Sequence, residues 1–267
     1  MNISIFGKSE WAKKLCCILN KLNTEVSGVY DTNLQSAVEL AAAIDSKAYI
    51  NTKEAIECSD VIILTDNNDM KTYLSLIKKH KAENKILCMI SKNNTSDKIY
   101  TDNLNTHFSL YSPVLFGKKD KITEAPSFMI EGYGIRYTEF IDFITSIGCK
   151  FTVLSIEDAK AFQSILNLYT NGIETLTKIL ETGLNELSVT DTELLSAITK
   201  QITDSGSYDG SFFINDTHSV IKTLDCLKIK KKSSLSSLYK ILGLNALEYT
   251  SYNKEEKEHF TKILIEN

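Results

Sequence analysis

The 267-residue sequence contains two prolines and a single arginine, Arg136, among 30 basic residues. Bidentate recognition of a phosphate by a guanidinium group therefore has only one candidate residue. No apolar run approaches the ~20 residues that a membrane-spanning helix needs. Residues 1–7 lack the charged start and the long apolar stretch of a signal peptide. We therefore expect a cytoplasmic protein that does not bind a membrane.

The sequence also lacks a large excess of either charge sign. Its 34 acidic and 30 basic residues give a net charge of -4, which argues against nucleic acid as the main partner. The six cysteines form no C-x-x-C pair, and the four histidines show no metal-ligand spacing. We therefore expect no bound metal and no disulfide framework. Because the cysteines lie in apolar stretches, they are expected to be buried free thiols.

The first half of the chain alternates short apolar runs with amphipathic segments, a pattern typical of a mostly parallel sheet flanked by helices. The pattern predicts helices at residues 10–22, 33–44, 68–79 and 137–147, and a short helix behind the capping-box sequence at residues 51–54. Both prolines fall in a predicted loop at residues 112–127. Strands are predicted at residues 3–6, 25–30, 48–50, 61–65, 85–90, 106–111, 127–131 and 150–154.

From residue 156 onward the character of the chain changes. This part contains no proline, and its apolar residues repeat at helical spacing. We therefore predict two domains, an α/β domain at residues 1–154 and an all-α domain at residues 155–267. The helices of the second domain are predicted at residues 157–184, 191–203, 217–227, 233–249 and 254–265.

The strongest local motif is a glycine-bearing turn between the first strand and the first helix. Gly7, Ser9 and Ala12 align with the G-x-G-x-x-G/A pattern of dinucleotide-binding folds. Gly7 permits the sharp turn, Ser9 stands where the backbone approaches a pyrophosphate, and Ala12 lets the helix pack on the strand. The N–H groups at the start of the helix favour phosphate. The motif predicts a Rossmann-like domain that binds NAD or NADP.

Two acidic residues at strand ends extend this candidate cofactor site. Asp31 ends the second strand, where an acid accepts hydrogen bonds from a ribose 2′-hydroxyl and repels a 2′-phosphate. This favours NAD over NADP, although Asp31 could instead cap the helix that begins near Asn33. Asp66 follows the strand at residues 61–65, at the sheet edge where ligands of open α/β folds bind. It could line the cofactor cleft or belong to a solvated turn.

Polar residues in the helical domain suggest where a substrate would bind. Gln163, Asn167 and Asn171 recur every four residues, which places their amides on one helix face. That face could form the substrate-facing wall of an interdomain cleft, or it could face solvent. Asp216 is predicted to cap the following helix. His218 is a candidate general acid or base, or a surface histidine.

Several segments resemble one known family over nearly the whole chain. Residues 28–30 resemble the end of its second strand, residues 60–66 its next strand and loop, and residues 110–116 its His-Pro-x-x-x-Phe segment. This family of bacterial oxidoreductases joins a Rossmann-like NADP-binding domain to a helical domain of unknown function. It is related to ketopantoate reductase and pyrroline-5-carboxylate reductase. The resemblance implies an α/β Rossmann-like N-terminal domain followed by an all-α C-terminal domain, and a homodimer.

The sequence departs from the family pattern at positions that bear on catalysis. Ser112, Gln163 and Thr223 stand where the pattern has histidine, and Ile214 stands where it has arginine. None of these side chains titrates near neutral pH, so an acid or base role at these positions would be lost. In the related reductases a lysine and an asparagine one helical turn apart serve the substrate carbonyl. The resemblance implies that Asn171 is the retained asparagine, with Asn167 one turn before it.

These observations predict an NAD(P)-dependent oxidoreductase that transfers hydride to or from a small carbonyl or imine substrate. The alternative is a catalytically degenerate nucleotide-binding or protein-interaction protein on the same scaffold. Methyl transfer from S-adenosylmethionine is a third hypothesis, which the long helical C-terminal domain disfavours. The apolar faces of the helical domain are too many for one layer, so we also predict a homodimer through that domain.

Overall fold

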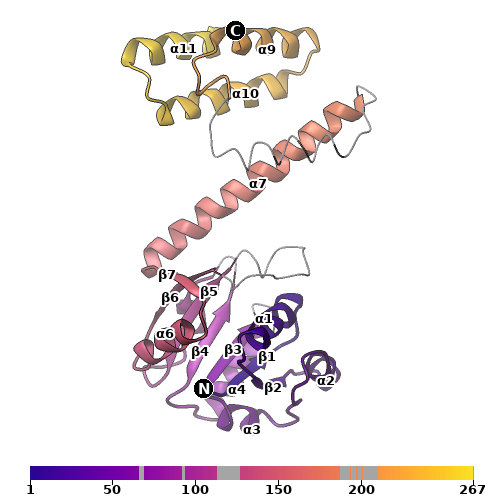
Figure 1. The fold of residues 1–267 in the computed structure, drawn as a ribbon, viewed down its shortest axis with the longest axis vertical. Helices are drawn as coiled ribbons and strands as arrows, with labels where there is room; N and C mark the ends of the chain where they lie inside the picture. Colours follow the sequence, from indigo (N-terminus) through magenta and orange to yellow (C-terminus); the bar gives the residue numbers. More distant parts are fainter. Residues whose placement is uncertain are drawn as a thin grey trace. The chain divides into compact units, whose positions relative to one another are not determined.

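The structure, a computed structural model, describes residues 1–65, 69–91, 94–112, 127–186, 193, 197, 200 and 210–266. The chain forms two compact units, Met1–Thr175 and Leu176–Asn267 (Figure 1). The boundary between the units falls inside one long helix, α7 (Ile156–Glu186). The predicted domain boundary at residue 154 falls just before this helix, and it stays a prediction.

The first unit is built on a seven-stranded sheet with the strand order β2-β1-β3-β4-β5-β6-β7. Strands β1 to β5 pair in parallel, β6 is antiparallel to β5, and β7 is parallel to β6. After β2 the chain crosses to the other side of β1, so the connections diverge between β1 and β3. The strands are β1 (Ile3–Phe6), β2 (Val26–Tyr30), β3 (Val61–Thr65), β4 (Ile86–Ile90), β5 (Thr106–Tyr111), β6 (Ser127–Tyr133) and β7 (Lys150–Val153).

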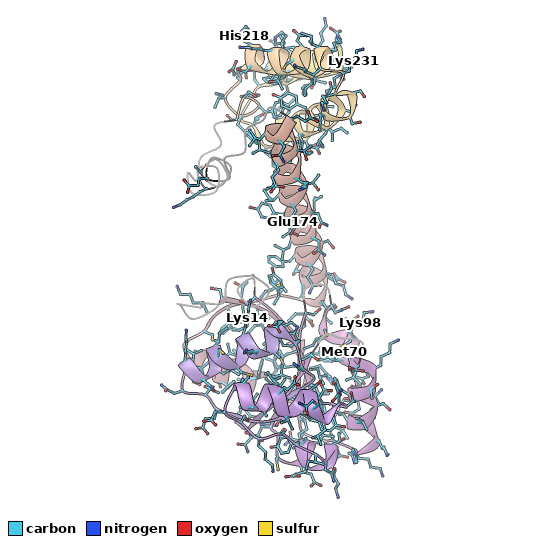
Figure 2. The ribbon with its side chains drawn as sticks, turned by 90° about the vertical axis from the view of Figure 1, so that its right-hand side faces the viewer. Lys14, Met70, Lys98, Glu174, His218 and Lys231 are labelled. Atoms are coloured by element: carbon cyan, nitrogen blue, oxygen red, sulfur yellow. The ribbon has the colours of Figure 1, made fainter. Side chains whose placement is uncertain are left out.

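Helices cover both faces of this sheet. Side chains of α1 (Glu10–Lys21), α2 (Leu34–Ala43) and α6 (Tyr137–Ser146) belong to one hydrophobic core. Those of α3 (Thr52–Glu57), α4 (Met70–Lys79) and the 3₁₀ helix η1 (Ser96–Ile99) belong to a second core. Figure 2 marks the two layers by Lys14 on α1 and Met70 at the start of α4.

Burial explains why the central strands were readily predicted. Every residue of β3 and β4 is buried, which agrees with the continuous apolar runs of their sequences. The predicted strand at residues 48–50 is wrong, because Ala48 forms only an isolated bridge to Val29. Asn51 then caps α3 by accepting a hydrogen bond from the Lys53 amide. This early helix start leaves no room for a longer strand.

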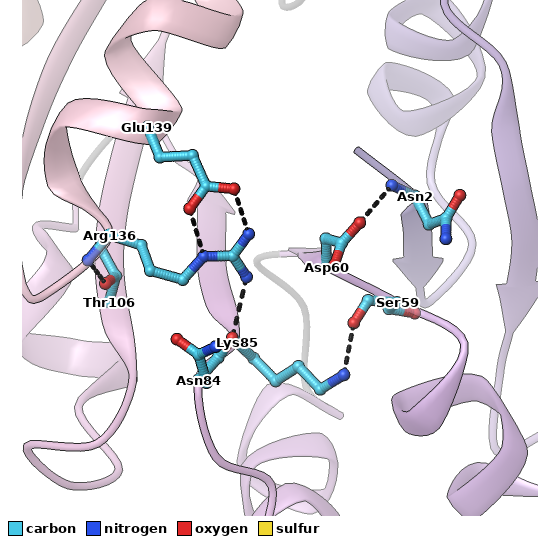
Figure 3. A network of polar contacts seen from close by, with 8 residues as sticks. All are labelled: Asn2, Ser59, Asp60, Asn84, Lys85, Thr106, Arg136 and Glu139. Carbon is cyan, nitrogen blue, oxygen red and sulfur yellow. Dashed lines mark hydrogen bonds and ion pairs between the residues drawn. The ribbon is translucent and has the colours of Figure 1, made fainter.

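The single arginine has a structural role at the amino edge of the parallel strands (Figure 3). The Arg136 guanidinium pairs with the Glu139 carboxylate and donates from Nη1 to the Asn84 carbonyl at 2.8 Å. Its backbone amide donates to Thr106 Oγ1, also at 2.8 Å. Arg136 therefore links the start of α6 to the segments that enter β4 and β5. The Arg136 side chain is 13% exposed, and its guanidinium already pairs with Glu139 and the Asn84 carbonyl. The interpretation of Arg136 as a phosphate-binding residue is therefore wrong.

The described part of the second unit is helical. Asp216 caps helix α9, which begins at Thr217, by accepting a hydrogen bond from the Ser219 amide at 3.0 Å, as predicted. The core of this unit is formed by Val220, Leu224, Leu247, Phe260 and Leu264. The predicted helix at residues 191–203 lies largely outside the described residues. Besides the end of α7, the elements are α9 (Thr217–Ile229), α10 (Ser233–Ala246), η2 (Leu247–Tyr249) and α11 (Lys254–Glu266).

The cysteines are all free, but only three of the six are buried. Burial raises the pKa of the Cys16 thiol to about 12, so this group is not a thiolate at neutral pH. The expectation of burial is wrong for Cys17, Cys58 and Cys226. Neighbouring helical residues point in different directions, so Cys16 faces the core while Cys17 faces solvent.

No described helix is long and apolar enough to cross a membrane.

Candidate functional site

The turn between β1 and α1 has the backbone geometry that its sequence predicts. Gly7 adopts a φ of 98°, and its amide donates to the Tyr30 carbonyl at 2.8 Å, which ties the turn to the end of β2. Ser9 is the N-cap of α1, and its Oγ accepts a hydrogen bond from the Ala12 amide at 3.1 Å. Ala12 is fully buried in the core. Its small side chain therefore allows the close packing of α1 on the sheet.

Close packing beneath the turn explains why residue 7 is glycine. A Cβ atom at Gly7 would collide with Thr65 Oγ1 and would lie 3.1 Å from the Tyr73 ring. Thr65 is the last residue of β3, the strand next to β1 where the chain connections diverge. Its Oγ1 is buried and has no hydrogen-bond partner among the residues that the structure describes. The edge between β1 and β3 thus combines a close backbone approach with an unused hydroxyl group.

Asp31 joins the two loops that border this edge. Its Oδ2 accepts a hydrogen bond from the Lys8 amide at 2.9 Å, and its Oδ1 accepts one from the Asn33 amide at 2.8 Å. Asn33, and not Asp31, is the N-cap of α2, because its Oδ1 accepts from the Gln35 amide at 3.0 Å. The alternative interpretation of Asp31 as the helix cap is therefore wrong. The Asp31 carboxylate lies at the carboxyl ends of β1 and β2, and the residue as a whole is 9% exposed.

A charged pair lies beside Asp31. Lys8 Nζ forms an ion pair with Glu39 on α2, and Gln35 Nε2 donates to the other oxygen of that carboxylate at 3.1 Å. The hydrogen bond to Glu39 raises the pKa of Lys8, and the same bond lowers the pKa of Glu39. Both groups are therefore charged at neutral pH. Each side chain remains more than two-fifths exposed, so solvent screens the pair.

A row of hydroxyl side chains continues along the carboxyl edge. Thr65 ends β3, Ser91 directly follows β4, and Ser112 directly follows β5. All three residues are buried. Ser91 Oγ accepts a hydrogen bond from the Asn94 amide at 3.0 Å, whereas Ser112 Oγ has no hydrogen-bond partner within the described ranges. We call Thr65, Ser91 and Ser112 the hydroxyl row.

The hydroxyl row was not predicted as a unit. Ser112 was noted only as a replacement for a histidine, Thr65 only as the start of the polar segment that contains Asp66, and Ser91 was not noted. The available signal was a hydroxyl residue at the end of each of three successive apolar strands. In a parallel sheet such strand ends lie on one edge, about 4.8 Å apart from strand to strand.

The first turns of α7 pack beside the ends of β5 and β6. Ala159 is fully buried with Tyr111 and Met129, and Gln163 is 4% exposed. Gln163 Nε2 donates to the Asn94 carbonyl at 3.1 Å. Gln163 therefore holds the segment behind β4 in place instead of presenting a free amide.

The remaining predicted site residues differ in their surroundings. Asn167 and Asn171 lie one and two turns beyond Gln163 on α7, and both are exposed. They belong to the first compact unit, as do Gly7 and Asp31. Asp66 lies outside the described residues. The roles of these residues in binding or catalysis stay predictions.

One buried histidine is not suited to acid–base chemistry at this site. His107 lies near the start of β5, at the opposite edge of the sheet, and its ring packs against Tyr100 and Tyr133. Burial lowers the pKa of His107 to about 4, while the Asp102 charge opposes this shift. His107 Nε2 accepts a hydrogen bond from the Thr101 amide at 3.2 Å. The neutral ring thus serves the packing of the amino edge.

The sheet order, the glycine turn and the acid behind β2 define a Rossmann-like α/β domain, which a helical C-terminal region follows. In comparisons with known proteins, no protein-family model matches the chain. No curated protein sequence matches it either.

Similar solved structures exist at low sequence identity. A protein from Bacteroides fragilis, named as a candidate NADP oxidoreductase, is 16% identical with a TM-score of 0.69, covering 92% of this chain and 98% of that one. A Thermotoga maritima protein named without an activity is also 16% identical, with a TM-score of 0.67 and coverages of 96% and 98%. An imine reductase from Aspergillus terreus in complex with NADPH4 is 12% identical, with a TM-score of 0.60 and coverages of 99% and 92%. These similarities show a shared fold.

Proposed function

We propose that this protein is an NAD(P)-dependent oxidoreductase that transfers hydride to or from a small carbonyl or imine substrate. The observation that carries the proposal is the connection of the glycine turn to the acid behind β2, through the Lys8 amide and the Asp31 carboxylate. In dinucleotide-binding folds these two features hold the pyrophosphate and the adenosine ribose. Two of the similar structures are named as an NADP oxidoreductase and an imine reductase, which supports this class of activity.

The residues at the adenosine end fit a dinucleotide. Gly7 has no side chain where the backbone turns, and its positive φ keeps the turn tight. The N-terminus of α1 follows directly and favours a pyrophosphate through its N–H groups and its dipole. Asp31 would accept a hydrogen bond from a ribose hydroxyl. Ser9 would contribute through its backbone, since its side chain caps the helix.

The hydroxyl row fits the other half of the cofactor. Thr65 and Ser112 each keep a buried hydroxyl group without a hydrogen-bond partner among the described residues. Such groups cost free energy unless a ligand or water pairs with them, about 1–3 kcal/mol each. The nicotinamide ribose and carboxamide offer matching donors and acceptors. When bound, the cofactor supplies or accepts the hydride, and these side chains position it and exclude water.

The substrate would be oriented by α7. Asn171, with Asn167 one turn before it, can donate a hydrogen bond to a carbonyl oxygen or accept one from an iminium N–H. Gln163 is proposed to act indirectly, by holding the Asn94 segment behind β4. The strand ends would thus bind the cofactor, and α7 would orient the substrate.

Calorimetric titration with NADH, NADPH and S-adenosylmethionine tests the binding part of this proposal. We expect micromolar binding of a dinucleotide, weakened at least tenfold by Asp31→Ala. Hydride transfer is then followed by the absorbance of the reduced cofactor over a panel of small ketones and cyclic imines. Asn171→Ala should lower turnover, whereas Asn245→Ala on α10 is the matched control.

The alternative hypotheses give different results. Dinucleotide binding without hydride transfer to any compound of the panel would favour the catalytically degenerate protein. Preferential binding of S-adenosylmethionine would favour methyl transfer and overturn the proposal. Binding of none of the three ligands would also overturn it.

We also propose a homodimer in which α7 contributes to the interface. An apolar stripe on this helix is exposed in the single chain, with Ile165 67% and Leu168 76% exposed. Phe162, Tyr169 and Ile173 extend the stripe, and solvent contact of so many large apolar groups is unusual for a monomer. Light scattering coupled to gel filtration should give twice the chain mass. Ile165→Lys should shift the protein toward the monomer, while Glu174→Lys on the same helix (labelled in Figure 2) should not.

A further inference from the structure

We propose that Glu39 makes the dinucleotide site select NADH over NADPH by holding Lys8, whose backbone contacts Asp31, in an ion pair. This inference rests on the proposed function. It assigns a specificity role to a residue of α2 that no sequence motif marks. It also separates this chain from the similar structures that are named for NADP or contain NADPH4.

Lys8 lies next to the acid behind β2. Its backbone amide donates to Asp31 Oδ2 at 2.9 Å, so Lys8 lies beside the carboxylate that faces the adenosine ribose in this class of fold. A 2′-phosphate would occupy the same neighbourhood, since it replaces the 2′-hydroxyl. Lys8 is therefore a basic residue that a 2′-phosphate would meet at this position.

The stretch of chain that forms β2 and α2 carries no cationic side chain. Residues 22–46 contain no lysine, arginine or histidine, although this segment forms β2, the loop behind it and α2. Sites that accept NADP commonly place an arginine near the 2′-phosphate. Here, the loop behind β2 supplies Asp31, Thr32 and Asn33 instead.

Negative charges already surround the Lys8 ammonium group. Its Nζ pairs with Glu39, and Gln35 donates to the free oxygen of Glu39 at 3.1 Å, which fixes that carboxylate toward Lys8. Glu10 and Asp31 add further negative potential at Lys8. A 2′-phosphate would therefore have to compete with Glu39 for Lys8 while it faces the Asp31 carboxylate. A 2′-hydroxyl avoids both costs, because it can donate a hydrogen bond to Asp31.

The arrangement predicts that selectivity can be changed without rebuilding the turn. The Lys8–Glu39 pair is exposed to solvent, so its loss should not unfold the domain. Removing the Glu39 charge frees Lys8 for the 2′-phosphate. Removing Lys8 as well should cancel that gain.

The test measures affinities for NADH and NADPH by calorimetry on the full chain at fixed ionic strength. Wild-type protein should bind NADH more tightly than NADPH by about tenfold or more, because like charges oppose the 2′-phosphate. Glu39→Gln should raise the NADPH affinity several-fold and change the NADH affinity less. The double variant Glu39→Gln, Lys8→Met should return the ratio to that of the wild type.

Glu54→Gln is the matched control, since Glu54 on α3 forms a similarly exposed ion pair with Lys47. It should change neither affinity. Equal or tighter binding of NADPH by the wild type overturns the inference and leaves the proposed function standing. An unchanged ratio in Glu39→Gln overturns the role of Glu39. Failure of the wild type to bind either dinucleotide overturns the proposed function together with the inference.

Discussion

The Asp31 carboxylate accepts a hydrogen bond from the Lys8 backbone amide at 2.9 Å, although Asp31 lies 23 residues further along the chain. Its second oxygen accepts a hydrogen bond from the Asn33 backbone amide at 2.8 Å. One side chain thus fixes the loop behind β1 and the loop behind β2 against each other. The local structure of both loops therefore depends on the group to which the proposed function also assigns ligand binding.

Replacing Asp31 should affect both properties. Asp31→Ala removes two charge-assisted hydrogen bonds to backbone amides, and each is worth about 1.5–3 kcal/mol of unfolding free energy. We expect urea unfolding at a lower midpoint together with weaker dinucleotide binding. Asp142→Asn, a charge removal on an exposed face of α6, is the control. An Asp31→Ala protein of wild-type stability would show that these hydrogen bonds do not hold the loops.

Gly7→Ala should disrupt the turn for two separable reasons. The new Cβ would collide with Thr65 Oγ1, and the φ of 98° is unfavourable for alanine by about 1–2 kcal/mol. The second substitution Thr65→Ala removes the collision but not the backbone strain. We therefore expect the double variant Gly7→Ala, Thr65→Ala to recover part of the lost stability in thermal unfolding. If the double variant is as unstable as Gly7→Ala alone, the collision with Thr65 does not contribute and the loss comes from the backbone.

His107 should make the protein less stable in mild acid. Burial holds its pKa at about 4 in the folded chain, against about 6.5 when unfolded. The unfolded state therefore binds more protons as the pH falls from about 6.5 to 4, and the unfolding free energy drops there by roughly 2–3 kcal/mol. Well above pH 6.5, where His107 is neutral in both states, this contribution is constant. His107→Phe should flatten the profile of unfolding free energy against pH, and an unaltered slope would contradict this origin.

Arg136 should be sensitive even to the conservative exchange for lysine. Arg136→Lys keeps the charge but loses the planar fork that contacts Glu139 and the Asn84 carbonyl together. We expect a loss of about 1–3 kcal/mol in denaturant unfolding. Lys53→Ala, which removes an ion pair between two exposed side chains, should change the unfolding free energy by less than about 0.5 kcal/mol. Equal effects of the two substitutions would argue against a specific role of the guanidinium.

Local patterns were sufficient to predict much of the sheet and the glycine turn between β1 and α1. The apolar runs at β3 and β4 and the spacing of Gly7, Ser9 and Ala12 encode strand, turn and helix within a few residues each. The cap of α2 was ambiguous, because Asp31 and Asn33 both carry an oxygen that can accept amide hydrogens. Only the folded chain shows that Asn33 caps the helix and that Asp31 reaches back to Lys8.

Contacts between distant residues were beyond prediction from the sequence. Lys8 and Glu39 are 31 residues apart, and their pairing depends on how α2 packs against the turn. Gln163 lies 69 residues from Asn94, so its amide could equally have faced solvent. The 3₁₀ helix η1 also escaped prediction, because four residues are too few to show a period. These features are set by tertiary packing, which no local pattern records.

The hydroxyl row gives the two ends of the candidate cofactor site different sensitivities to ionic strength. Thr65, Ser91 and Ser112 carry no charge at any accessible pH, whereas Lys8, Asp31 and Glu39 form a charged cluster at the other end. Dissolved salt screens exposed charges over about 8–10 Å and leaves hydrogen bonds between neutral groups largely unaffected. Raising the salt concentration should therefore alter how the adenosine portion is held while the nicotinamide portion stays anchored.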